Sequence, residues 1–152
     1  MKTEEAKNRK TGDLTREKGA DGKRPGPNKK VGERGEKTAS RSLERCGYRI
    51  AERNFRCRSG EIDIVAVKEP EDAEDGRALP TVVFVEVKAR NNLSYGVPSL
   101  AVTAEKQRHL LKAARFYARR FGLENVPCRY DVIEILFLDG RTYLRHIRNA
   151  FS

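Results

Sequence analysis

Apolar and polar positions alternate along the chain in a pattern that predicts seven elements from residue 32 onward. Residues 32–46 have apolar side chains at helical spacing, and residues 103–121 repeat that pattern in a longer helix. Strands are predicted at 48–58, 60–67, 81–90, 128–138 and 141–147, where β-branched and aromatic residues gather. The order α-β-β-β-α-β-β predicts one α/β (α+β) domain with a mixed five-stranded sheet flanked by two main helices.

Particular residues mark where these elements begin, end or break. Thr103 is the expected N-cap of the second helix, and Gly47 and Gly122 are the expected stops of the two helices. Arg53 and Asn54 interrupt the apolar alternation, so a bulge or a short break is expected in the first strand. Asp139-Gly140 is a strong hairpin turn between the last two strands.

The segments outside these elements are strongly charged. Residues 1–31 lack apolar periodicity and are rich in lysine, arginine, glycine and proline, so we expect a disordered basic tail before a folded domain of residues 32–152. Residues 69–80 form an acidic connection without an apolar anchor. Over all 152 residues the net charge is +10, which favours a polyanionic partner, nucleic acid first. Solubility or contact with an anionic membrane surface would also explain the charge.

Composition also bears on location and metal chemistry. No apolar run approaches the roughly 20 residues that span a bilayer, and no hydrophobic signal segment opens the chain, so we expect a cytoplasmic protein without a membrane partner. The three cysteines, Cys46, Cys57 and Cys128, lie far apart and are expected to be reduced thiols. Together with only two histidines, they offer no recognisable zinc ligand cluster.

The predicted strands at 60–67 and 81–90 carry acidic residues among apolar ones, at positions where a buried sheet would normally have apolar side chains. Side chains alternate faces along a strand, so Asp63 shares a face with Glu61 and Val65, while Ile62, Ile64 and Ala66 take the other. On the next strand Glu86 and Lys88 share a face, opposite Val83, Val85 and Val87. A symmetric hairpin pairs residues whose numbers add to about 149, which places Asp63 opposite Glu86 and Glu61 opposite Lys88.

Two carboxylates so placed repel each other unless a positive charge lies nearby, and a divalent metal with oxygen ligands would supply it. The alternative is an acid pair on a solvated face, which is the commoner situation for acids on strands. The apolar flanking residues favour a buried pair over a solvated one.

Charged residues on the two helices add further candidates. Glu36 falls on the apolar stripe of the first helix, where the sequence alone slightly favours an acid stabilised by the helix dipole over a site residue. On the second helix, Lys106 lies near the start and could project toward the acids. Arg108, Lys112, Arg115 and Arg119 form a basic stripe, which is either a phosphate-binding surface or simply the solvated face.

Motifs from residue 32 onward carry a resemblance to known families. They are Gly35-Glu36, Asn54, Gly60-Glu61-Ile62-Asp63, Phe84-Val85-Glu86-Val87-Lys88-Ala89-Arg90, Tyr95-Gly96, Val102-Thr103 with Lys106, and Arg129-Tyr130-Asp131-Val132. An acid followed by Glu-x-Lys on the next strand resembles the PD-(D/E)xK nuclease superfamily, which has a restriction-endonuclease-like core. The chain resembles more closely the YraN family of bacterial proteins, which are similar to archaeal Holliday-junction resolvases. The basic tail and the long acidic loop lie outside the pattern.

The resemblance implies a role for each matched residue. Asp63 and Glu86 would bind Mg²⁺ or Mn²⁺, with the Val87 carbonyl as a third ligand, and Lys88 would position or polarise the attacking water. Glu36 would complete the catalytic group from the first helix. Nucleic acid, DNA first, would contact the cations Arg90, Lys106, Arg108, Lys112 and Arg115. The implied function is a metal-dependent nuclease acting on DNA, including branched or damaged DNA. The alternative is a catalytically silent nucleic-acid-binding protein of the same fold, and formation of a homodimer stays open.

Overall fold

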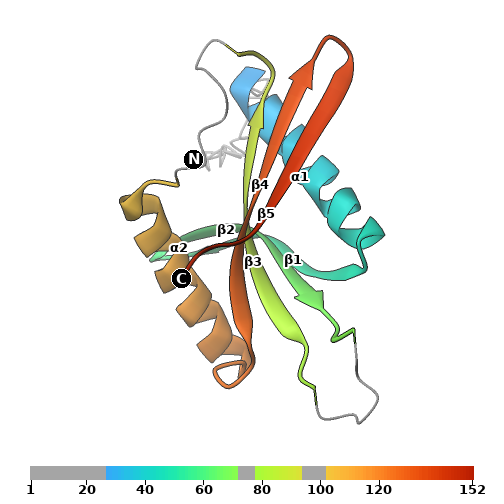
Figure 1. Cartoon of the computed structure of the whole chain (residues 1–152). Coiled ribbons are helices and arrows are strands. Elements are labelled where there is room, and N and C mark those ends of the chain that lie inside the picture. Colours follow the sequence, from blue (N-terminus) through green and yellow to red (C-terminus); the bar gives the residue numbers. More distant parts are fainter. Residues whose placement is uncertain (1–26, 72–77, 94–101) are drawn as a thin grey trace, which may run out of the picture.

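A computed structural model describes residues 27–71, 78–93 and 102–152, and it has the predicted element order (Figure 1). The elements are α1 (Pro27–Arg45), β1 (Tyr48–Cys57), β2 (Gly60–Lys68), β3 (Thr81–Arg90), α2 (Ala104–Phe121), β4 (Cys128–Leu138) and β5 (Arg141–Phe151). The five strands form one mixed sheet in the order β1-β2-β3-β4-β5. Only β3 and β4 pair in parallel, and α2 makes the crossover between them. The predicted fold class is confirmed.

The two helices cover opposite faces of this sheet (Figure 1). Ala39 and Leu43 of α1 pack on Ile64, Val83 and Ile133 in one buried cluster. The second cluster lies under α2 and contains Phe55, Phe84, Leu110 and Tyr117. Because helices cover both faces of the sheet, the central strands β2 and β3 are nearly continuously apolar rather than alternating. An acid inside these strands is therefore conspicuous.

Several predicted boundaries are confirmed, and others need correction. The Thr103 hydroxyl accepts a hydrogen bond from the Lys106 N–H at 3.2 Å, and Gly122 ends α2 at φ 65°. Helix α1 begins at Pro27, so residues 27–31 of the predicted tail are helical. Proline suits a first turn, where the backbone N–H has no helical partner. The last strand extends beyond the predicted residue 147 to Phe151.

Some predictions concern residues 1–26, 72–77 and 94–101, which lie outside the described residues. They are most of the predicted tail, part of the acidic loop, and Tyr95-Gly96.

The alternation of faces along β2 was predicted wrongly at one point. Ile62 packs in the cluster under α2, whereas Ile64 and Ala66 pack in the cluster under α1. On the neighbouring strand, Asn54 lies between the pairing partners of Ile62 and Ile64 and takes a left-handed φ of 53°. A left-handed residue breaks the two-residue alternation of side chains in β1. The side chains of β1 and of its partner β2 therefore exchange faces at this point. The expected interruption of β1 at Asn54 is confirmed, and a register shift lies close by, between Ile50 and Glu52.

A glycine allows α1 to lie directly against β3. A Cβ atom added to Gly35 would come within 2.3 Å of the Ala89 Cβ, closer than two side chains can approach. The next residue in the helix is Glu36, so this close approach brings Glu36 down to the sheet. Gly32, one turn earlier, has nothing within 4 Å of an added Cβ.

Gly35→Ala should destabilise the protein by roughly 1–2 kcal/mol in urea denaturation, because the overlap with Ala89 outweighs the helix propensity gained. Ala89→Gly in the same chain should restore much of the loss by removing the opposing methyl group. Gly32→Ala is the matched control and should be neutral or stabilising by up to about 1 kcal/mol. A Gly35→Ala variant as stable as the Gly32→Ala variant would contradict the close packing.

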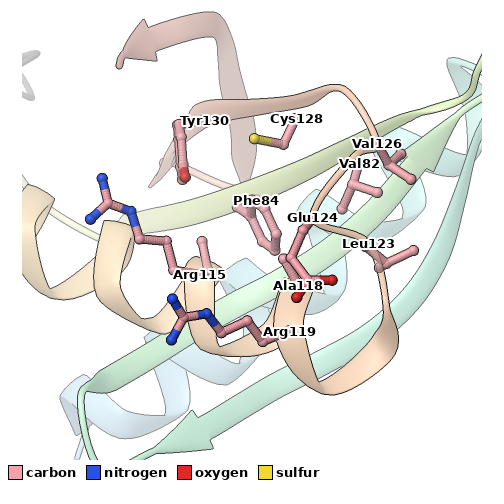
Figure 2. A pocket seen from close by; sticks show the side chains of 11 residues that line it. Val82, Phe84, Arg115, Ala118, Arg119, Leu123, Glu124, Val126, Cys128 and Tyr130 are labelled. Carbon is pink, nitrogen blue, oxygen red and sulfur yellow. The ribbon is translucent and has the colours of Figure 1, made fainter.

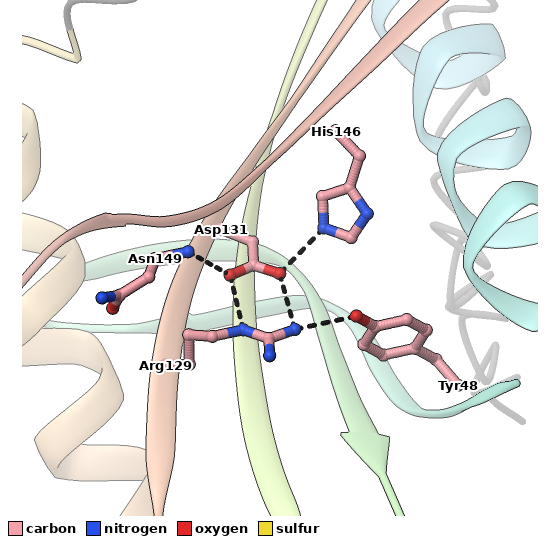
Figure 3. Close-up of polar contacts among 5 residues, drawn as sticks. All are labelled: Tyr48, Arg129, Asp131, His146 and Asn149. Carbon is pink, nitrogen blue, oxygen red and sulfur yellow. Dashed lines mark hydrogen bonds and ion pairs between the residues drawn. The ribbon is translucent and has the colours of Figure 1, made fainter. Parts of the chain in front are cut away.

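A buried ionic network ties three strands together beneath α1 (Figure 3). The Asp131 side chain is 0% exposed, and its two oxygens accept hydrogen bonds from the Arg129 guanidinium at 2.9 and 3.0 Å. His146 Nε2 lies 2.8 Å from Asp131 Oδ2, and the Asn149 N–H donates to Oδ1 at 2.9 Å. Arg129 also donates to the Tyr48 hydroxyl at 2.8 Å. The network links β1, β4 and β5, so we assign it a structural role.

The network makes stability depend on pH. Burial alone would raise the pKa of Asp131, but hydrogen bonds from His146, Arg129 and Asn149 outweigh it and hold the pKa below its ordinary 3.8. A depressed pKa stabilises the fold above about pH 4, and this stabilisation is lost as the pH falls through the depressed value.

Asp131→Asn should therefore cost about 3 kcal/mol of unfolding free energy at pH 7, because Arg129 loses its buried counter-charge. The difference from the wild type should shrink in urea melts below pH 4. Asp139→Asn removes the same charge from an exposed turn and should change stability little. An Asp131→Asn variant with wild-type stability at pH 7 would refute the structural role.

Candidate functional site

The candidate site begins where the β2–β3 ladder ends. The two strands pair from Lys68↔Thr81 to Ile64↔Val85, which is the predicted register. Beyond that pair, the Asp63 Oδ2 atom accepts a hydrogen bond from the Val87 N–H at 2.7 Å. A side-chain oxygen thus takes the place of the next carbonyl of the ladder, and Asp63 is held against the edge of β3.

Glu86 lies beside Asp63 and is 7% exposed. Its Oε1 atom is 3.4 Å from the ammonium group of Lys106, and its buried Oε2 atom has no hydrogen-bond partner among the described residues. After burial, the negative charge of Glu86 is the main cause that raises the pKa of Asp63, so the two carboxyl groups lie close enough to act on each other. The predicted convergence of the two acids is therefore what the structure shows.

Burial raises the pKa of both carboxyl groups, and repulsion from Glu86 adds to the shift of Asp63. Burial, followed by the charge of Glu86, raises the pKa of Asp63 from 3.8 to about 7, although the Val87 hydrogen bond opposes this. Burial also raises the pKa of Glu86 above its ordinary 4.5, against the positive charge of Lys106. Both carboxyl groups are therefore more easily protonated than ordinary ones, and a bound cation would offset the cost of charging them.

Helix α2 brings Lys106 to the acids through its N-terminus. The Thr103 cap fixes the first turn, and the Lys106 ammonium lies 3.4 Å from Glu86 and 3.9 Å from Glu61. The expected projection of Lys106 toward the acids is confirmed. The predicted pairing of Glu61 with Lys88 is wrong, because the β2–β3 ladder has already ended at Ile64↔Val85. Glu61 pairs on the other edge of β2 with Arg56 of β1.

The structure also brings the other two predicted catalytic residues to this point. The negative charge of Glu36 contributes to the raised pKa of Asp63, and the positive charge of Lys88 lowers that of Glu86. Glu134 has no predicted role, yet it is 5% exposed and lies directly beside Lys88 across the β3–β4 pairing. The sequence signal that could have identified Glu134 is an acidic residue within the otherwise apolar β4 segment.

Backbone geometry supports the Val87 carbonyl as a third oxygen donor. The N–H and C=O groups of one strand residue point toward the same edge of the strand. Since the Val87 N–H points to Asp63, its carbonyl points into the same gap between the strands. Among the described residues, no group of three or more acidic, histidine or cysteine side chains could hold a metal. The donor set is therefore two carboxylates and one carbonyl, which suits a hard cation that keeps several waters.

The predicted nucleic-acid contacts fall in two places. Arg108, Lys112 and Arg115 are exposed on α2, as the basic stripe predicted. Arg90 lies apart from them, at the end of β3 beside Asn28 and Ala89. No helix in the described ranges is long and apolar enough to cross a membrane.

The fold and this site define a class: an α+β protein with a buried acid pair where two strands of a mixed sheet separate. A family model described as "Uncharacterised protein family UPF0102" matches residues 35–135, which include every acid and lysine of the site. The UPF0102 protein of Geobacter sulfurreducens is 50% identical over 126 residues, covering 82% of this chain and 91% of the relative. The UPF0102 protein of Symbiobacterium thermophilum is 49% identical, covering 81% and 97%. That of Clostridioides difficile is 40% identical, covering 82% and 98%.

The chain belongs to the UPF0102 family. This confirms the YraN family that its motifs resemble.

The acid pair makes stability depend on pH in the opposite direction to Asp131. A raised pKa means that the charge on Asp63 destabilises the fold: the penalty is absent below pH 3.8, grows up to about pH 7 and is complete above it. Asp63→Asn stays neutral and still accepts the Val87 hydrogen bond. It should exceed the wild type by on the order of 1 kcal/mol at pH 8 and match it near pH 4. Urea melts at both pH values test this, with Asp139→Asn as the control. A loss of stability at pH 8 would show that the two carboxylates do not repel.

Proposed function

We propose that this protein is a metal-dependent nuclease that hydrolyses phosphodiester bonds in DNA. The observation that carries the proposal is the buried Asp63–Glu86 pair. The charge of Glu86 raises the pKa of Asp63, and one Glu86 oxygen has no hydrogen-bond partner among the described residues. Burying two acids together is unfavourable in a purely structural role, whereas a bound cation would remove the repulsion. The resemblance to the PD-(D/E)xK superfamily supports the same proposal.

Mg²⁺ or Mn²⁺ fits the oxygen donors at this point. Asp63, Glu86 and the Val87 carbonyl would hold the ion, which would stabilise negative charge on the phosphate and lower the pKa of a water. Lys88 would donate a hydrogen bond to the attacking water and balance the charge that develops on the phosphate. Glu36 would orient that water from the side of α1.

One observation favours a second candidate, a nucleic-acid-binding protein without cleavage activity. The Lys106 ammonium lies 3.4 Å from Glu86 and already supplies positive charge to the pair without a metal. In the nuclease, Lys106 would have to move aside from Glu86 or share that carboxylate with the ion. Metal titration by calorimetry distinguishes the two candidates, because only the nuclease needs the ion.

The direct test is a cleavage assay on single-stranded, duplex and four-way-junction DNA with Mg²⁺ or Mn²⁺. Glu86→Gln should reduce cleavage by at least about 100-fold, since one negative ligand is lost. Lys88→Met should suppress cleavage to a similar degree, yet leave metal binding largely intact because lysine is not a ligand. Glu105→Gln and Lys37→Met remove the same charges from exposed positions and should cleave like the wild type.

Two outcomes would reject the nuclease. One is equal cleavage by wild type and Glu86→Gln, which would place the activity elsewhere or in a contaminant. The other is DNA binding by the wild type without metal binding or cleavage, which would establish the binding-only candidate.

A further inference from the structure

A cavity of about 320 Å³ lies between the second half of α2, the segment that follows it, and strands β3 and β4 (Figure 2). It is distinct from the acid pair. On α2, Lys106 contacts the acid pair, whereas Arg115 lines the cavity nine residues further along the same helix. At 1.5 Å per residue the two points are about 13 Å apart along the helix axis.

The walls of the cavity are apolar and aromatic. Val82, Leu123 and Val126 supply aliphatic surface, and Phe84 and Tyr130 supply rings. These two rings stack 5.6 Å apart with an angle of 26° between their planes, so they form a fixed surface. A third ring, Phe151, stacks on Tyr130 from β5 at 5.4 Å and is part of the same aromatic row.

Charged side chains stand at the mouth of the cavity. Figure 2 shows Arg115 and Arg119 projecting from α2 on one side, with Glu124 on the segment after the helix. Both arginines are exposed and continue the basic row of Arg108 and Lys112. No acidic group pairs with either arginine among the described residues, so both guanidinium groups are available to an anion.

This combination selects one kind of ligand. Apolar and aromatic walls favour a flat, weakly polar ring, and adjacent arginines favour a phosphate. Glu124 would repel a second anion, but it can accept hydrogen bonds from an exocyclic amino group. A nucleotide has all three features, and its base is small enough for the volume. An apolar peptide would leave the arginines without a partner of opposite charge. A fatty acid would offer them a carboxylate, but its flexible chain has no flat ring to stack on Phe84 and Tyr130.

We propose that this cavity takes up one unpaired nucleobase of a DNA strand, with the neighbouring phosphate bound by Arg115 and Arg119. This inference rests on the proposed function, which makes DNA the substrate. It restricts that substrate to DNA with unpaired bases near the site of cleavage. A base inside a regular duplex would first have to leave its stack, at a cost of a few kcal/mol. Strands that are already unpaired avoid that cost and are preferred.

The test is binding, measured by fluorescence anisotropy in EDTA so that no cleavage occurs. The probes are a labelled single strand and a strand of equal length and charge whose sugars carry no bases. The wild type should bind the base-containing strand about tenfold more tightly. Ala118→Leu, which fills the cavity from α2, should remove that preference while keeping the affinity for the abasic strand. Cys128→Phe fills the cavity from an exposed position on β4 and should do the same if Ala118→Leu does not fold.

A matched pair of arginines tests the phosphate contact. Arg119→Gln should weaken binding of both strands and reduce the salt dependence by about one charge. Arg120→Gln removes the same charge from the adjacent position, which does not line the cavity, and should have less effect on both. Equal effects of the two variants would overturn the assigned phosphate contact.

The proposal is overturned if the wild type binds both strands equally, or if a folded cavity-filling variant keeps the full preference for bases. It is also overturned if filling the cavity changes only the oligomeric state, because the occupant would then be a second copy of the chain. These results are independent of the nuclease assay. A protein that prefers bases but does not cleave supports the cavity and rejects the nuclease, and the converse result rejects only the cavity.

Discussion

The hydrogen bond from the Val87 N–H to Asp63 controls the arrangement of the whole site. It forms where the β2–β3 ladder stops, so a carboxylate takes the place of a backbone carbonyl at the edge of β3. The same separation of the strands leaves room for the Glu86 carboxylate and directs the Val87 carbonyl into the gap. Three oxygen donors therefore meet because one strand departs from another. A regular hairpin through this point would have used those backbone groups for pairing.

Both helices place a charged side chain near the gap between β2 and β3. Gly35 lets α1 approach Ala89 of β3, which brings the neighbouring Glu36 within electrostatic reach of Asp63. The Thr103 cap begins α2 beside the acids, so that Lys106 can pair with Glu86 in the first turn. Side chains from both faces of the sheet thus act on one point. This is possible only at a break in the sheet, since an intact sheet would separate its two faces.

Most of the fold could be predicted from local signals, and the errors fall where local signals end. The apolar periodicity and the caps Thr103 and Gly122 predict the elements, and the symmetric loop predicts the hairpin register. The reversal of faces between Ile62 and Ile64 could not be foreseen, because it depends on the left-handed conformation of Asn54 on a neighbouring strand. The hydrogen bond from the Val87 N–H to Asp63 could not be predicted either. The alternation rule assigns a side chain to one face of a sheet, and it does not place a side chain against the backbone edge of a neighbouring strand. The cavity beside Tyr130 was also missed, because its walls come from stretches that are distant in the sequence, β3 on one side and residues 114–130 on the other.

The balance of charge at the site differs in sign from that of the chain as a whole. The chain carries +10, but around the gap acids outnumber cations among the described residues: Glu36, Glu61, Asp63, Glu86 and Glu134 against Arg56, Lys88 and Lys106. A nucleic-acid backbone would be attracted to the basic surface of α2 and repelled by this acidic point. A divalent cation would be drawn to the same point and would reverse that repulsion. In the proposed nuclease a phosphate would therefore reach this point only after an ion has bound, so metal binding, more than DNA binding, would distinguish the nuclease from a silent relative.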